Sequence, residues 1–284
     1  MSTTSYKGQK YCKGMFLPVD DMLTVEEVLK ITINNKPFTI TMRTPGSEKE
    51  LLRCLLFTEN VYPDHETDPI ITVKGTTGKG FINQVDVTIP IEKMGKGLEI
   101  SRSIISVSSC GICGKSELDM AKNESEKIVN DEIIEPGIIG TMFEQMVSKQ
   151  NTFMLSGGSH AAAAFTLEGK LLDIQEDIGR HNAVDKVIGS LLFQKQLKTA
   201  KCLVISGRIS YEIVNKCFAA GIPFLAAISA PSSFAIDLAE QLGITLMAFC
   251  RDNKFTAYSQ IGNIKIKKNT TAKAQSREEK KHNI

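Results

Sequence analysis

The chain has 284 residues, of which 42% are hydrophobic and 23% charged, and its formal net charge at pH 7 is +2. This composition is that of a globular protein with one large core or two modest ones. A chain without Trp and with so small a charge offers no obvious nucleic-acid surface, and no apolar run reaches the length of a membrane span or a signal peptide. Seven scattered Cys suit a reducing compartment. We therefore expect a cytoplasmic protein with neither a nucleic-acid nor a membrane partner.

The first half of the chain predicts hairpins and one helix. Residues 28–44 alternate apolar and polar side chains about a central polar turn, which predicts a β-hairpin. Ser47 and Glu50 have the spacing of a capping box, ahead of leucines at helical spacing. Residues 70–73 and 85–91 predict two further strands around a Gly-rich turn.

The second half alternates short apolar strands with helices, which is typical of a layered α/β domain whose sheet has a largely parallel part. The predicted strands cover residues 153–155, 161–167, 171–174, 202–205, 224–228 and 245–249. The predicted helices cover residues 137–149, 180–194, 211–220 and 234–242. In such sheets the loops that leave the carboxyl ends of the strands build the binding sites.

These patterns divide the chain into four regions. We expect an N-terminal segment (1–27), a smaller hairpin-rich part (28–105), an α/β domain (106–262) and a basic tail (263–284). The tail from Ile264 onward holds seven Lys and Arg against two Glu, a balance of +5. Its polar composition predicts a disordered, solvated segment, with an arm that binds a charged surface as the alternative.

A loop at the start of the third region contains the C-x-x-C pair, Cys110 and Cys113. It follows a predicted strand at 103–107 and precedes residues 115–121, which can open a helix. A cysteine just ahead of a helix N-terminus, beside Lys115, is favoured as a thiolate. The thiolate is the form of cysteine that attacks a sulfur donor.

Three other readings of this pair compete with sulfur transfer. A structural zinc site needs four ligands, and the sequence has neither a second C-x-x-C nor an H-x₃₋₅-H, which leaves only zinc shared across a dimer as an open alternative. Two core cysteines fit poorly in so polar and Gly-rich a loop. A thioredoxin-like redox pair is the strongest rival, although thioredoxin motifs follow the first strand of a compact βαβ unit. Spacing alone leaves redox chemistry and sulfur transfer both open.

Three loops at strand-to-helix junctions predict an anion site. Arg180 and His181 stand beside a Gly where a helix begins, although capping and salt bridges would also explain that charged run. Arg208, in the loop 206–210, and Ser232, in the loop 230–233, follow successive strands, and Ser232 is a candidate N-cap. The loops 206–210 and 230–233, with their hydroxyls and backbone N–H groups, together predict a nucleotide-sized ligand. His160, after a Gly-Gly turn, is interpreted as an ordinary interior histidine.

Several blocks of the chain, in this order, resemble the FdhD family of formate dehydrogenase accessory sulfurtransferases. They are residues 42–46, 108–114, 157–162, 176–186 and 206–233, continuing to 249–251. The resemblance covers roughly residues 29–259 and rests on the ordered blocks rather than on the C-x-x-C alone.

The resemblance implies a function and a set of residues. Family members take persulfide sulfur from a cysteine desulfurase and pass it to molybdenum held by two guanine-dinucleotide pterins, which activates formate dehydrogenase. Cys110 matches the persulfide cysteine and Cys113 its partner. The segment matching the cofactor-binding one comprises Phe249, Cys250, Arg251, Asp252, Asn253 and Lys254. Under this resemblance the molybdenum cofactor is a bound substrate, GDP a ligand, and the chain a homodimer.

The resemblance also implies that the α/β domain is similar to the cytidine deaminase fold. A zinc deaminase would need H-x-E and P-C-x-x-C. Here His160 is followed by two alanines, and Ser109 precedes Cys110. The deaminase reaction is therefore not expected.

Overall fold

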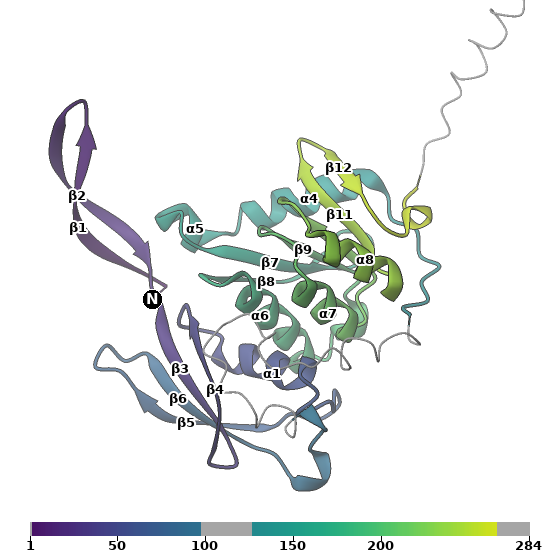
Figure 1. Ribbon diagram of the computed structural model, residues 1–284, viewed down its shortest axis with the longest axis horizontal. Helices are drawn as coiled ribbons and strands as arrows, with labels where there is room; N and C mark the ends of the chain where they lie inside the picture. The colour runs from purple at the N-terminus through teal and green to yellow at the C-terminus, as the bar shows by residue number, and fades with distance from the viewer. Residues whose placement is uncertain (1, 98–126, 266–284) are drawn as a thin grey trace, which may run out of the picture.

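The computed structural model describes residues 2–97 and 127–265, which form three β-sheets with their helices (Figure 1). The sheets are a two-stranded hairpin, a four-stranded sheet of order β4-β3-β6-β5, and a six-stranded sheet of order β12-β11-β10-β9-β7-β8. The predicted strand at 103–107, the loop with Cys110 and Cys113, and nearly all of the basic tail lie outside the described residues. Among the described residues, no helix is both long and apolar enough to cross a membrane.

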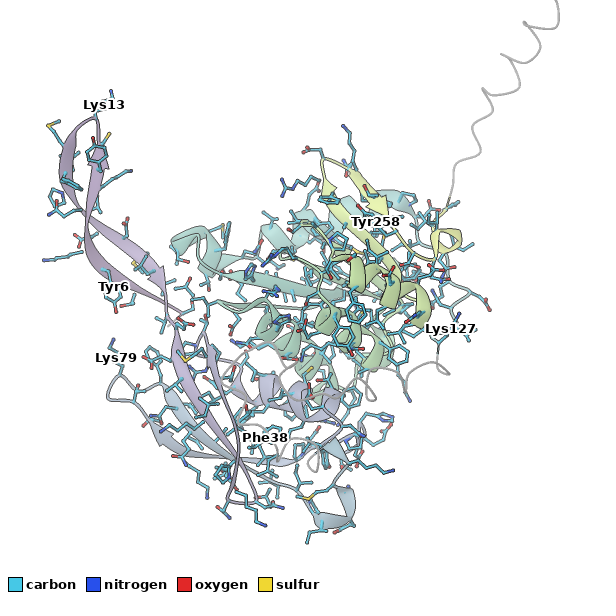
Figure 2. The ribbon with its side chains drawn as sticks, in the orientation of Figure 1. Tyr6, Lys13, Phe38, Lys79, Lys127 and Tyr258 are labelled. Atoms are coloured by element: carbon cyan, nitrogen blue, oxygen red, sulfur yellow. The ribbon has the colours of Figure 1, made fainter. Side chains whose placement is uncertain are left out.

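The N-terminal hairpin consists of β1 (Thr3–Cys12) and β2 (Met15–Thr24), which pair antiparallel along their whole length. Its two-residue turn, Lys13-Gly14, has positive φ at both positions, as a tight hairpin turn requires. The hairpin projects from the body of the protein with Lys13 at its tip (Figure 2). The sequence predicted no element in this segment.

The four-stranded sheet confirms the predicted hairpin and strands of the first half. Its strands are β3 (Glu27–Ile33), β4 (Lys36–Arg43), β5 (Ile70–Thr76) and β6 (Ile82–Thr88). The inward side chains of β3 alternate along the strand and pack against leucines of α1 (Glu48–Thr58). Helix α1 thus covers one face of this sheet.

The capping box predicted at Ser47 is wrong. Ser47 occupies the N-cap position of α1, but its φ is 56°, and its hydroxyl makes no capping bond. That left-handed backbone directs the hydroxyl to Gln175 Oε1, 2.9 Å away, so Ser47 joins α1 to the six-stranded sheet instead. The carboxylate of Glu48 accepts from the Gly46 amide at 2.8 Å and pairs with Arg43 at 2.9 Å.

The six-stranded sheet contains the strands of the second half, and most predicted strands and helices of this half are confirmed. Its strands are β7 (His160–Phe165), β8 (Leu171–Asp177), β9 (Cys202–Ile205), β10 (Phe224–Ala227), β11 (Thr245–Arg251) and β12 (Lys254–Ala257). Strands β9, β10 and β11 are parallel, whereas β7 runs antiparallel to β8 and β9, and β12 antiparallel to β11. Strands β9, β10 and β11 are thus the parallel part that the sequence predicted, within a sheet that is mixed as a whole.

Helices cover both faces of this sheet (Figure 1). The helices are α4 (Pro136–Val147), α5 (Asn151–Ser156), α6 (Arg180–Phe193), α7 (Tyr211–Ala219) and α8 (Ser233–Leu242), with 3₁₀ turns at Ile91–Lys93, Leu197–Thr199 and Ile261–Asn263. Helices α6, α7 and α8 share one apolar core with one face of the sheet, and α4 shares a second core with the other face. Helix α1 packs on α6 and so joins the two larger sheets.

The strand predicted at 153–155 is wrong, because these residues belong to helix α5. The carboxylate of Glu176 accepts hydrogen bonds from the amides of Thr152 and Phe153, each 2.8 Å long, and so satisfies the start of the helix. Gly157, with φ 65°, ends it. The helix is therefore held by a side chain from β8, which a local pattern does not reveal.

Candidate functional site

The candidate site lies along one edge of the six-stranded sheet. Strands β8, β9, β10 and β11 all end there, and antiparallel β7 begins there. The edge therefore gathers His160, the start of α6, and the loops that begin at Ser206 and at Ile228. It is the position where α/β sheets bind ligands.

The stem of Arg180 and the ring of His160 lie beside Gly207 at this edge, and Arg208 follows Gly207 in the chain. A Cβ placed on Gly207 would lie 3.2 Å from Arg180 Cβ and 3.4 Å from His160 Nδ1, so a glycine permits the close approach. Burial lowers the pKa of His160, and the charges of Arg180 and Arg208 lower it further. We call these three residues the basic cluster.

His181 follows Arg180 in the sequence, but its side chain makes buried contacts within the fold. Its side chain is buried, with Nε2 3.0 Å from Ser210 Oγ and 3.6 Å from Glu212 Oε2. These contacts join the start of α6 to the start of α7. The predicted capping role of Ser232 is confirmed, because its hydroxyl accepts from the Ala235 amide at 3.2 Å.

The predicted segment 249–254 forms the end of β11 and its turn into β12. Phe249 has φ 55°, an uncommon conformation for a bulky residue, at an irregularity in the β11–β12 pairing. Its side chain is 48% exposed. Asp252 and Asn253 supply the two positive-φ positions of the turn, between Arg251 and Lys254. The segment thus presents an aromatic ring, two cations and polar side chains at the edge.

A pocket of about 570 Å³ is lined by residues of this turn and of helix α4. It is lined by Pro136, Ile139, Gly140, Phe143, Glu144, Val147, Ser148, Ile228, Cys250, Arg251, Asp252, Asn253, Lys254 and Phe255. Its size is that of a small-molecule site. The pocket brings five of the six predicted residues 249–254 together, with Phe249 adjoining them in sequence.

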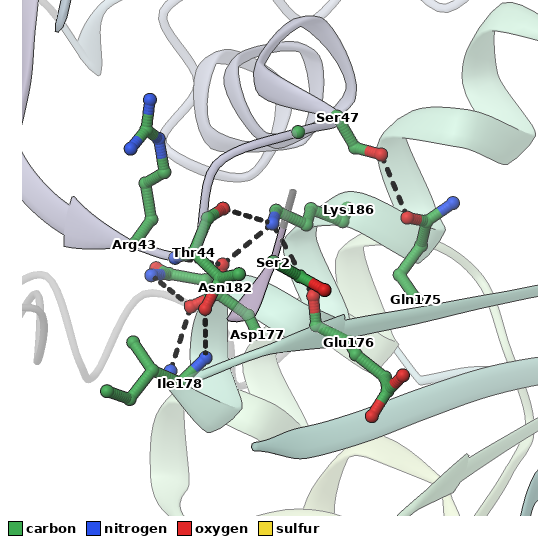
Figure 3. Close-up of polar contacts among 12 residues, drawn as sticks. Ser2, Arg43, Thr44, Ser47, Gln175, Glu176, Asp177, Ile178, Asn182 and Lys186 are labelled. Atoms are coloured by element: carbon green, nitrogen blue, oxygen red, sulfur yellow. Dashed lines mark hydrogen bonds and ion pairs between the residues drawn. The ribbon is translucent and has the colours of Figure 1, made fainter. Parts of the chain in front are cut away.

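Some residues of the charged run 176–186 stabilise the fold, and Arg180 lies at the edge of the sheet. Asp177 and Lys186 form a buried ion pair of 2.8 Å, and Lys186 also donates to the Thr44 carbonyl at 2.8 Å (Figure 3). Asn182 and the Gly179 amide donate to Asp177 Oδ1. These contacts fasten the residues after β4 to the sheet. Arg180, by contrast, has a buried Nε without an acceptor among the described residues.

Burial excludes four of the five described cysteines as nucleophiles. It raises the pKa of Cys54, Cys202 and Cys217, and it raises the pKa of Cys250 to about 12. A thiol with so high a pKa is uncharged at neutral pH and unreactive. Cys12, near the tip of the N-terminal hairpin, is exposed.

The sequence missed two features of the edge. His160 belongs to the basic cluster, although it was interpreted as an ordinary interior histidine. Tyr211 and Phe234 stack with ring centroids 5.0 Å apart and planes inclined by 5°, at the starts of α7 and α8. The sequence signal for these features is limited to their positions, since each of the three residues lies close to the predicted start of a strand or helix.

The fold and the edge define the class of protein: a mixed α/β protein with N-terminal hairpins and a basic, loop-built edge on its main sheet. The family model described as FdhD/NarQ family matches residues 24–265, and the chain belongs to this family. The family resemblance seen in the sequence is thereby confirmed.

Named relatives cover most of the chain. It is 40% identical over 246 residues to the sulfur carrier protein FdhD of Streptomyces avermitilis, covering 84% of this chain and 87% of the relative. It is 40% identical over 260 residues to the protein of the same name in Sulfolobus acidocaldarius, covering 91% and 97%. A crystal structure described as a formate dehydrogenase accessory protein, from Desulfotalea psychrophila, has a TM-score of 0.72 at 20% identity, covering 93% of this chain and all of that one. This last likeness shows the fold.

Proposed function

We propose that the chain is a sulfur carrier that accepts persulfide sulfur on Cys110 from a cysteine desulfurase. The proposed acceptor is the molybdenum bis(molybdopterin guanine dinucleotide) of a formate dehydrogenase, bound as a substrate. Family membership and the names of relatives at 40% identity support this proposal. The observation that carries the residue assignment is the burial of four of the five described cysteines, which cannot supply a thiolate.

The transfer of sulfur from the donor to Cys110 needs no outside oxidant. The Cys110 thiolate attacks the outer sulfur of the donor persulfide, the donor's S–S bond breaks, and the donor cysteine leaves as a thiolate. Release is a second displacement, in which Cys113 attacks the Cys110 sulfur and the outer sulfur leaves as hydrosulfide. A Cys110–Cys113 disulfide then forms, and a thiol reductant must reduce it before the next cycle.

The sheet edge is the proposed place for the cofactor. Arg180, Arg208, Arg251 and Lys254 supply the cations for its phosphates, with the pocket between α4 and the β11–β12 turn beside them. In this proposal Ser232 and His181 support the edge through the starts of α8 and α7. GDP is the expected minimal ligand, and a homodimer in the cytoplasm is the proposed form of the protein.

Intact-mass analysis after incubation with a cysteine desulfurase and cysteine tests the carrier proposal. We expect the wild-type chain to gain the mass of one sulfur atom, removable by a thiol reductant, and the Cys110→Ala variant to gain none. Cys12→Ala is the matched control, since Cys12 is the exposed cysteine of the described part, and it should behave as wild type. A disulfide without any sulfur gain would favour a thioredoxin-like oxidoreductase, the alternative that the sequence left open.

A further inference from the structure

His160 stands where three strand ends meet, and the structure gives it charged neighbours that its sequence context did not reveal. It is the first residue of β7 and is paired with Asp177, the last residue of β8. Arg180 begins the helix after β8, and Arg208 lies in the loop after β9. The ring of His160 and the stem of Arg180 both pack against Gly207.

The carboxylates near this cluster are already engaged. The charged groups that act on His160 are Arg180 from α6, Arg208 from the β9–α7 loop and Asp177 from β8. Asp177 is ion-paired with Lys186 and accepts from Thr44, Gly179 and Asn182. Within the residues that the structure describes, no salt bridge joins Arg180 or Arg208 to a carboxylate.

The same place holds hydrogen-bond donors without acceptors. Arg180 Nε is buried and has no partner in the described part of the chain. In that same part, the amide of the buried residue Gly207 makes none of the loop hydrogen bonds, although Ser206 and Ile209 in the same loop do. Buried donors are normally satisfied by protein, water or a ligand, so these point to an acceptor-rich group.

We propose that His160, Arg180 and Arg208 form a subsite for a phosphate-type dianion, and that His160 takes up a proton from solvent when the dianion binds. The inference rests on the proposed function, because it names the part of the edge that holds a phosphate of the nucleotide cofactor. Burial and the two guanidinium charges lower the pKa of His160, so the ring is neutral at pH 7 in the free protein. A dianion between the three groups offsets both guanidinium charges and accepts a hydrogen bond from the protonated ring. Binding and protonation therefore favour each other.

An NMR titration of the histidine rings tests this coupling directly. The chain has four histidines, so the His160→Gln variant assigns the His160 signal. Sulfate is the probe, since it remains a dianion wherever histidine titrates, and chloride at equal ionic strength is the reference. We expect sulfate to raise the titration midpoint of His160 by about one pH unit, which means about tenfold tighter binding of sulfate to the protonated protein. His65, an exposed histidine beside Glu66, is the internal control and should keep its midpoint.

The Arg180→Gln variant distinguishes binding of sulfate at a specific site from a general effect of salt on histidine titration. In chloride its His160 midpoint should rise, because one of the two guanidinium charges that lower it is gone while burial and Arg208 remain, and sulfate should shift it several-fold less than in wild type. Equal sulfate shifts at His160 and His65, or an Arg180→Gln variant that titrates as wild type, would overturn the proposal. A second arm replaces sulfate with GDP. If GDP binds without moving His160, this inference fails while the nucleotide proposal stands; if sulfate moves His160 and GDP does not bind, the subsite stands and the nucleotide proposal fails.

Discussion

Replacing Lys186 by Met should destabilise the protein strongly, since Lys186 fastens the two larger sheets together. Its side chain is 2% exposed, and its Nζ lies 2.8 Å from both Asp177 Oδ2 and the Thr44 carbonyl oxygen (Figure 3). Met keeps most of the stem volume but removes the charge and the donors. Breaking a buried ion pair by removing one partner costs about 3–5 kcal/mol. Asp177 retains N–H donors from Thr44, Gly179 and Asn182, so we expect a loss near the lower end, about 3 kcal/mol.

Urea unfolding followed by circular dichroism measures this loss, and Lys195→Met is the matched control. Lys195 pairs with Asp68 at 3.0 Å, but its side chain is 45% exposed, and such surface pairs contribute about 0–1 kcal/mol. The double variant Asp177→Asn/Lys186→Met should lose less than the sum of the two single losses, because it leaves no unpaired buried charge. The reasoning is refuted if Lys186→Met costs no more than Lys195→Met.

Three further predictions concern pH, reactivity and packing. The lowered pKa of His160 means that this residue binds a proton more readily in the unfolded chain than in the folded one. The contribution of His160 to the free energy of unfolding should therefore be fully present above about pH 6.5, the ordinary pKa of histidine, and be lost as the pH falls below it. Denaturant midpoints should fall less steeply with acid in His160→Gln than in wild type. Mass spectrometry after iodoacetamide treatment of the native protein should find the four buried cysteines unlabelled and Cys12 labelled. Gly189→Ala should cost about 1–3 kcal/mol in chemical denaturation, because its Cβ would lie 1.8 Å from the Glu50 carbonyl oxygen, whereas Gly137→Ala, with nothing within 4 Å, should be neutral or slightly stabilising.

The elements that the sequence predicted well are those whose pattern reflects local burial. The apolar run 202–205 is strand β9 without a change of boundary, because a central strand is buried on both faces. The hairpin of β3 and β4 and the helix α6 were also found, since periodicity and a polar turn are local signals.

The errors arose where a distant side chain decides the local structure. Residues 153–155 have a strand-like composition, yet Glu176 from β8 satisfies the helix amides there. Ser47 has the sequence of a cap, yet its hydroxyl bonds to Gln175. The direction of β7 could likewise not be predicted, because a run of alanines has the same pattern in a parallel strand as in an antiparallel one.

That direction explains why the basic cluster was only partly predicted. Arg180 and Arg208 follow predicted strands, so their place at the carboxyl edge could be inferred. His160 is the first residue of β7 and would lie at the opposite edge of the sheet if β7 ran parallel to β9. Only the antiparallel pairing of β7 with β8 and β9 brings His160 to the two arginines.

The buried contacts of the charged run 176–186 hold the first turn of α6 and therefore also set the position of Arg180 at the edge of the sheet. Asp177 accepts from the Gly179 amide and from Asn182 Nδ2, and these bonds fix the first turn of α6. Arg180 begins that helix, so its position depends on the same buried network that holds the residues after β4. The network also positions Gly207 indirectly, because Gly207 packs on the Arg180 stem. A change in the buried network that leaves the protein folded should therefore still displace Arg180 and weaken the proposed binding of a dianion at the basic cluster, although in this proposal none of the network's members touches the dianion.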